Sequence, residues 1–233
     1  MKMKKALLLF AGAFLLCACT VNFRSLRKKH QPLTTSTPTV KPFERIEVAG
    51  SFDVFYQQGD TTSVRIEAPS ETLKKMDVYS DGHTLHIGVE HDLTDLSFAS
   101  FPEDVKVYVT SPDLIAVELA GSGDFKGQGR LDTDNLKLSI AGSGEISLDD
   151  VICNALKADI AGSGDVKLDN VATATANFSI AGSGDIKAHF SQCENVKTDI
   201  AGSGDVKLSG HVKTHQESIA GSGEVDATAV VSD

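Results

Sequence analysis

Six acidic residues recur in the second half of the chain at intervals of 19 to 21 residues, each directly after the same short motif. They are Asp124, Glu145, Asp165, Asp185, Asp205 and Glu224, here called the carboxylate ladder. Carboxylates in a regular series can bind hard cations, act in pairs as general acid and base, or form ion pairs with lysines. Which chemistry applies depends on the elements that bring the six together.

The motif before each acid is Ala-Gly-Ser-Gly, and its copies begin at Ala120, Ala141, Ala161, Ala181, Ala201 and Ala220. Apolar and polar residues alternate beside it, as in Leu-Lys-Leu-Ser-Ile at 136–140, which indicates half-buried β-strands. The two glycines predict a sharp corner with positive φ. We therefore expect an all-β fold: a single-stranded, β-helix-like β-solenoid with about 20 residues per coil.

Stacked coils place equivalent residues in columns with a spacing of about 4.8 Å. The column before the corner is aliphatic and predicts a core: Leu119, Ile140, Ile160, Ile180, Ile200 and Ile219. A second core column follows the corner: Phe125, Ile146, Val166, Ile186, Val206 and Val225. The carboxylate ladder points outward, and two residues further on stands a column that is mostly lysine: Lys126, Ser147, Lys167, Lys187, Lys207 and Asp226. Because neighbouring carboxylates repel one another, we expect these lysines to pair with them.

A row of bound cations is the alternative interpretation of the ladder, since carboxylate oxygens are ligands for Ca²⁺. Each rung offers one carboxylate with a lysine nearby, which disfavours that interpretation. We expect no metal site and no cofactor.

The two cysteines of the repeat region test the predicted register. Cys153 and Cys193 fall in one column two rungs apart, with Thr173 between them. Two rungs correspond to about 9.6 Å, which exceeds the Cα separation that a disulfide can bridge. We therefore predict two free thiols.

The N-terminus reads as an export signal. A positive segment, 1–5, precedes an apolar run, 6–16, that is too short to span a bilayer. The next four residues, Leu-Cys-Ala-Cys at 16–19, resemble a bacterial lipobox, which implies a signal peptide over 1–18 and lipidation of Cys19. Residues 19–42, rich in Pro and Thr, are expected to form a flexible linker to the membrane. A plain secretory signal is the alternative.

Residues 43–233 are expected to form one all-β domain, with an irregular β-region at 43–119 and the repeat solenoid at 120–233. A partial copy of the motif stands at 49–53. In the last repeat, His215 and Glu217 occupy positions that hold leucine elsewhere, which predicts a polar cap against end-to-end stacking.

Charge is distributed unevenly along the chain. The first 42 residues contain eight basic residues and no acid, so 43–233 carries 14 basic and 32 acidic residues, a net charge of −18. A body this acidic repels phosphate backbones, so no nucleic-acid partner is expected. The expected partners are a membrane, through the lipid anchor, and an unknown protein or glycan.

The repeated corners, the segment 111–119, and the segment 46–54 with Gly59 and Asp60 resemble the head-GIN-domain family of autotransporter-adhesin-like lipoproteins common in Bacteroidetes. The resemblance covers about residues 43–225. It implies a single β-helix-like domain and an adhesin-type or ligand-binding role.

We therefore expect a non-catalytic, lipid-anchored cell-envelope protein of the outer membrane, facing either the periplasm or the outside, with the carboxylate ladder as its interaction surface. The alternative is a polysaccharide-active, pectinase-like β-helix enzyme, with Asp149, Asp150 and the ladder near Asp165 as candidate acids. A glycan site would use exposed aromatic rings, and the three tyrosines of the first region are the candidates: Tyr56, Tyr79 and Tyr108. The favoured interpretation of these tyrosines is that they pack in the core.

Overall fold

The computed structural model describes residues 32–89 and 105–231. The predicted signal peptide, Cys19 and the linker up to residue 31 lie outside the described residues. Within those ranges the N-terminal elements are β1 (Leu33–Ser36), β2 (Arg45–Gly50), β3 (Asp53–Gln58), β4 (Ser63–Pro69), α1 (Ser70–Leu73), β5 (Met76–Ser80), β6 (Thr84–Val89), β7 (Lys106–Ser111) and β8 (Ala116–Gly121). No described helix has the length and hydropathy needed to cross a bilayer.

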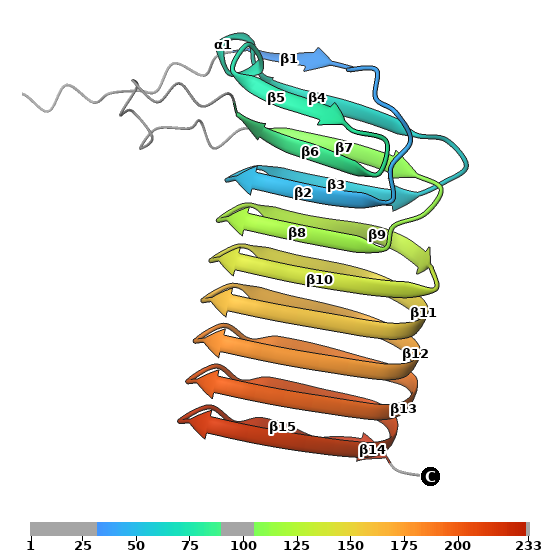
Figure 1. Cartoon of the computed structure of the whole chain (residues 1–233), viewed down its shortest axis with the longest axis vertical. Coiled ribbons are helices and arrows are strands. Elements are labelled where there is room, and N and C mark those ends of the chain that lie inside the picture. Colours follow the sequence, from blue (N-terminus) through green and yellow to red (C-terminus); the bar gives the residue numbers. More distant parts are fainter. Residues whose placement is uncertain (1–31, 90–104, 232–233) are drawn as a thin grey trace, which may run out of the picture. The chain divides into compact units, whose positions relative to one another are not determined.

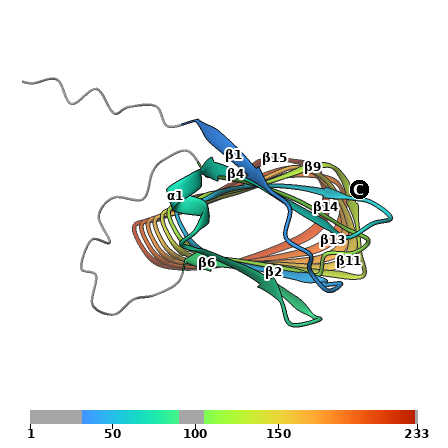
Figure 2. The same ribbon diagram turned by 90° about the horizontal axis from the view of Figure 1, so that it is seen from above.

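The repeat region follows with β9 (Asp124–Asp132), β10 (Asn135–Gly142), β11 (Glu145–Gly162), β12 (Asp165–Gly182), β13 (Ile186–Gly202), β14 (Val206–Gly221) and β15 (Val225–Val231). A strand such as β11 makes a whole coil: its first half pairs with β9 and its second half with β10, all in parallel. The coils thus build two faces of parallel strands (Figure 1). We call them the post-corner face and the pre-corner face, according to whether their segments follow or precede the Ala-Gly-Ser-Gly corner. Viewed along the stack, successive coils superpose (Figure 2).

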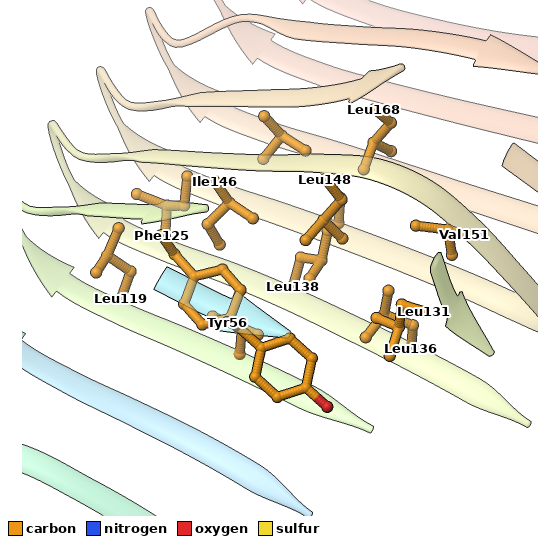
Figure 3. Close-up of a cluster of buried hydrophobic side chains, with 14 of the residues drawn as sticks. Tyr56, Leu119, Phe125, Leu131, Leu136, Leu138, Ile146, Leu148, Val151 and Leu168 are labelled. Atoms are coloured by element: carbon orange, nitrogen blue, oxygen red, sulfur yellow. The ribbon is translucent and has the colours of Figure 1, made fainter. Parts of the chain in front are cut away.

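The predicted β-solenoid and its register are confirmed. Ile140 pairs with Leu119 on one side and Ile160 on the other, and Ile146 pairs with Phe125 and Val166. Both predicted core columns are at most 2% exposed down to the fifth coil. Figure 3 shows their side chains interlocking with those of neighbouring coils between the two faces. Burial of these alternating positions is what makes the period-two pattern fold.

The first region is more regular than expected, but its coils are stacked out of chain order. On the pre-corner face β2 lies between β6 and β8, and on the post-corner face β3 lies between β7 and β9. The coil formed by β2 and β3 is therefore inserted between two coils, β6–β7 and β8–β9, that both follow it in the chain. It keeps the repeat register, because Gly50 pairs with Gly121. Because of this insertion, neighbouring coils in the first region are not about 20 residues apart in the chain, so the sequence shows no clear period there.

The predicted linker is shorter than expected. Leu33–Ser36 form β1, which pairs antiparallel with β4, so residues 33–36 belong to the folded body. The sequence here has no apolar alternation, and three of the four β1 residues are exposed. Backbone pairing with the open edge of β4, rather than burial of side chains, therefore holds this strand.

The two glycines of a corner differ in φ, which corrects the expectation that both adopt positive φ, but both lie close to the preceding coil: a Cβ on Gly182 would lie 2.1 Å from the carbonyl oxygen of Gly162. The first has positive φ, as in Gly182 at 141°. The second, such as Gly184, is not among the positive-φ glycines, but a Cβ there would lie 2.0 Å from the carbonyl oxygen of Gly164 on the preceding coil. It is a close-approach glycine.

The cysteine prediction is confirmed. Thr173 pairs with Cys153 on one side and Cys193 on the other, and both cysteines are buried and free. Burial raises the pKa of the Cys193 thiol to about 11 and also raises that of Cys153. Buried thiols of this kind pack as small apolar groups.

The last coil is polar where the others are apolar. In the column that contains Phe178, the next residues are the fully buried Thr198 and then Glu217. His215 Nε2 lies 3.3 Å from Thr198 Oγ1. Polar side chains therefore occupy these core positions in the last coil, as the sequence predicted. Ile219, predicted as the last member of a core column, is instead 39% exposed, because no further coil of the described residues covers it on the pre-corner face.

Replacing Gly184 with Ala tests the close-approach role. We expect Gly184→Ala to lose about 2 kcal/mol of unfolding free energy, because the new methyl group must push two coils apart. Gly88→Ala is the matched control, since its Cβ would meet nothing nearer than 3.8 Å. Denaturant unfolding measures both. Equal stability of the two variants would contradict the assignment.

Native-state alkylation tests the buried thiols. At pH 8 a thiol with a pKa of about 11 is ionised only on the order of 0.1% of the time. Iodoacetamide should therefore leave Cys193 and Cys153 unmodified in the folded chain and modify both in denaturant, as read by peptide mass spectrometry. Modification before unfolding, or a peptide pair linked by a disulfide, would refute this.

Candidate functional site

The carboxylate ladder lies on the post-corner face, in register as predicted. Glu145 pairs with Asp124 and with Asp165. Further along, each carboxylate binds the next coil: the backbone N–H groups of Asp185 and Asp205 donate to Oδ1 of Asp165 and Asp185, at 3.1 and 2.9 Å. Oδ1 of Asp205 accepts the N–H of Glu224 at 2.9 Å. These aspartates therefore join successive coils through side chain and backbone.

The lysine column compensates the ladder only in part. Lys126 Nζ lies 3.2 Å from Asp124 Oδ2, and Lys167 forms an ion pair with Glu145. The hydrogen bond that Lys167 donates to the Glu145 carboxylate raises the pKa of Lys167. Lys207 instead pairs with Asp226 of its own column, at 3.6 Å. Among the described residues, Lys187 has no carboxylate within ion-pair distance.

A groove opens over the ladder at its C-terminal half. It has a volume of about 440 Å³ and lies across β12 to β15. Its charged lining includes the lysines and the aspartates of three successive rungs: Lys167, Lys187 and Lys207, with Asp165, Asp185 and Asp205. We call it the charged groove. Three of its rungs present one acid and one base at the spacing of parallel strands, about 4.8 Å, whereas its last rung presents two acids, Glu224 and Asp226.

The ladder continues into the first region, which the sequence analysis missed. Val54 pairs with Phe125, so Asp53 stands in the ladder next to Asp124. Asp53 pairs with Lys106, which pairs with Glu67. The partial motif at 49–53 could have indicated that Asp53 belongs to the ladder. No sequence feature could have indicated this for Lys106 and Glu67, because their coil lacks the motif.

The pre-corner face also carries charge. Its column before the corner alternates acid and serine in register: Glu118, Ser139, Asp159, Ser179, Asp199 and Ser218. Each of the three acids forms an ion pair with a lysine. The nitrogen-to-oxygen distances are 2.9 Å for Lys137 with Glu118, and 2.6 Å both for Lys157 with Asp159 and for Lys197 with Asp199. This face is therefore internally neutralised, in contrast to the charged groove.

The acids singled out for glycoside hydrolysis serve as structural ligands. Asp150 accepts hydrogen bonds from Arg130 and Asn170, both at 2.8 Å, and Arg130 lowers the pKa of its carboxyl. Asp149 accepts the N–H of Gly129 at 3.0 Å. A glycosidase general acid needs the opposite shift, a raised pKa. Asp150 therefore does not have the environment of such an acid.

Histidine and tyrosine side chains complete the survey of the described residues. No three His, Cys, Asp or Glu side chains in this part of the chain converge as a metal site would require. Tyr56 is buried in the core, as the core-packing interpretation predicted, and its ring stacks on that of Phe125 with centroids 6.0 Å apart. Tyr79 is 48% exposed and stacks on His86, so core packing does not describe it. Tyr108 is half-buried on the post-corner face.

Comparison with known proteins agrees with this geometry. The family model described as "Putative auto-transporter adhesin, head GIN domain" matches residues 42–206 and 168–233. The chain belongs to this family. No curated protein matches the chain.

Solved structures share the fold. A protein described as a putative adhesin, from Bacteroides fragilis, is 23% identical with a TM-score of 0.67, over 85% of this chain and 97% of its own. A protein described as a putative lipid binding protein, from Parabacteroides distasonis, is 20% identical with a TM-score of 0.57, over 87% and 98%. A putative adhesin from Parabacteroides merdae is 21% identical with a TM-score of 0.53, over 87% and 97%.

Removing one ladder carboxylate tests its contact with the next coil. Asp185→Ala deletes the acceptor of the Asp205 N–H and should lower the midpoint of thermal unfolding by roughly 2–4 °C. Asp185→Asn keeps an oxygen at that position and should lose less than half as much. If the two variants melt together below the wild type, the lost charge and not the lost acceptor is responsible.

Proposed function

We propose that this chain is a non-catalytic, lipid-anchored protein of the cell envelope that binds an extended partner, a protein or a glycan, along the charged groove in the manner of an adhesin. The observation that carries the proposal is the groove itself, in which an aspartate and a lysine repeat over three rungs and Lys187 has no ion-pair partner among the described residues.

Repetition is the reason that binding fits better than catalysis. A catalytic centre needs a few groups in one unique arrangement. Three successive rungs of the charged groove present the same acid and the same base, so nothing distinguishes one of these three rungs from the next. Such a surface matches a ligand whose own polar groups repeat along its length.

Family membership and the N-terminal sequence support the envelope assignment. The family is named for adhesins, which act at cell surfaces. The lipobox-like residues 16–19 provide an anchor at Cys19, and residues 20–32 join it to β1. Multiple acyl chains on Cys19 would hold the protein stably on the outer membrane.

Removal of the groove lysines tests the proposal. We expect the triple variant Lys167→Ala, Lys187→Ala, Lys207→Ala to reduce retention of the full chain on immobilised envelope proteins and polysaccharides at least tenfold, because each lysine faces the ligand. The matched control is Lys137→Ala, Lys157→Ala, Lys197→Ala on the pre-corner face, which removes the same charge.

Surface plasmon resonance measures retention, and new reducing ends are assayed on the same polysaccharides. The control triple should retain wild-type binding, and no reducing ends should appear. Equal losses in the two triples would assign the effect to net charge. Turnover of a polysaccharide would refute the non-catalytic assignment.

A further inference from the structure

A second groove lies on the post-corner face near the N-terminal end of the described body, away from the charged groove. It has a volume of about 610 Å³, within the usual range for small-ligand sites. It opens where β1 ends: pairing of β1 with β4 stops at Ser36 and Ile66, and residues 37–40 then form a wall beside β4. We call it the aromatic groove.

Its floor contains two rings on neighbouring strands. Phe55 on β3 pairs with Tyr108 on β7, and the rings stack with centroids 5.2 Å apart. The Arg65 guanidinium lies 3.9 Å from the Tyr108 centroid, and Lys126 Nζ lies 6.0 Å from that of Phe55. Contacts with cations on both sides fix the rings. Because β4 and β3 lie on opposite sides of β7, Arg65 and Phe55 cover the two faces of the Tyr108 ring, and the edges of the two rings form a pre-organised apolar floor.

Hydroxyl and amide groups stand beside the rings. Ser63, Thr110 and Gln57 lie in register across three strands, two residues along from the ring row. Ser63 and Gln57 are exposed and Thr110 is half-buried, and all three line the groove. Such groups both donate and accept hydrogen bonds. A row of them beside an apolar floor matches a ligand with hydroxyl groups on one side and C–H groups on another.

Charge in the aromatic groove is balanced, although residues 43–233 have a net charge of −18. Arg65 is the only charged residue in the lining of this groove. Its guanidinium forms an ion pair with Glu67, and the Tyr108 hydroxyl lies 3.4 Å from the same carboxylate. Because the cation is already paired, the groove offers no excess positive charge to an anion. The surrounding acidic body would also repel one.

We propose that the aromatic groove is a binding site for a neutral saccharide of one to three sugar units. The ring pair contacts the C–H groups of a sugar, and the row of Ser63, Thr110 and Gln57 bonds its hydroxyl groups. A peptide strand fits less well, since β3 and β7 each have a strand paired on both sides and offer no free backbone. The site is separate from the charged groove, so either proposal can fail alone.

A glycan array provides the test, with the full chain as analyte and neutral oligosaccharides printed beside their sialylated, uronic-acid and sulfated counterparts. We expect binding to a subset of neutral saccharides and no gain from added acid groups. Isothermal titration with the strongest binder should show at least a tenfold loss for Tyr108→Ala and a severalfold loss for Gln57→Ala. Tyr108→Phe, which keeps the ring, should bind as the wild type does.

Gln57 is exposed, so Gln57→Ala reports on the site even if Tyr108→Ala fails to fold. Gln216→Ala, at an exposed glutamine on the pre-corner strand β14, is the matched control and should have no effect. The triple lysine variant of the charged groove should also bind normally. Binding of no neutral saccharide, a preference for acidic ones, binding to phosphatidylglycerol vesicles instead, or unchanged affinity in Gln57→Ala would each overturn the proposal.

Discussion

The close approach of backbones at the Ala-Gly-Ser-Gly corner is the constraint on which the rest of the structure depends. At each corner the second glycine comes so near to the carbonyl of the preceding coil that a Cβ would lie 2.0–2.4 Å from it. Only glycine fits there, and the first glycine of each corner meets the same limit, since a Cβ on it would lie 1.9–2.3 Å from a carbonyl oxygen of the preceding coil. The stack is thereby locked in register, and a one-residue slip would turn every core side chain outward.

Register converts a sequence period into surfaces. With the corners aligned, aliphatic residues form continuous core columns, and the polar residues between them form outward columns of like residues. Like charges in one column repel, and the two faces relieve this differently. The pre-corner face alternates acid with serine and pairs each acid with a lysine, whereas the post-corner face uses backbone N–H groups and an incomplete set of lysines. The ion pairing of the lysine column is thus incomplete, and among the described residues Lys187 of the charged groove has no carboxylate within ion-pair distance.

Sequence reasoning succeeded where neighbours in space are one period apart in the chain. The pairing of Cys153 with Thr173, the ladder from Asp124 to Asp165 and the polar last coil all follow from the repeat. It failed where the period breaks. The position of β2 and β3 between later strands and the pairing of β1 could not be predicted, because those contacts join segments with no shared pattern.

Within the repeat region the sequence by itself determined the architecture, the register, the core and the placement of the carboxylate ladder, because a strict period leaves one way to bury the alternating side chains. Only the tertiary structure decided which charges are neutralised and where the grooves lie. Ion pairs such as Lys207 with Asp226 depend on side-chain reach across coils. The aromatic groove depends on Phe55, Tyr108 and Arg65 from three strands whose order along the stack differs from their order in the chain.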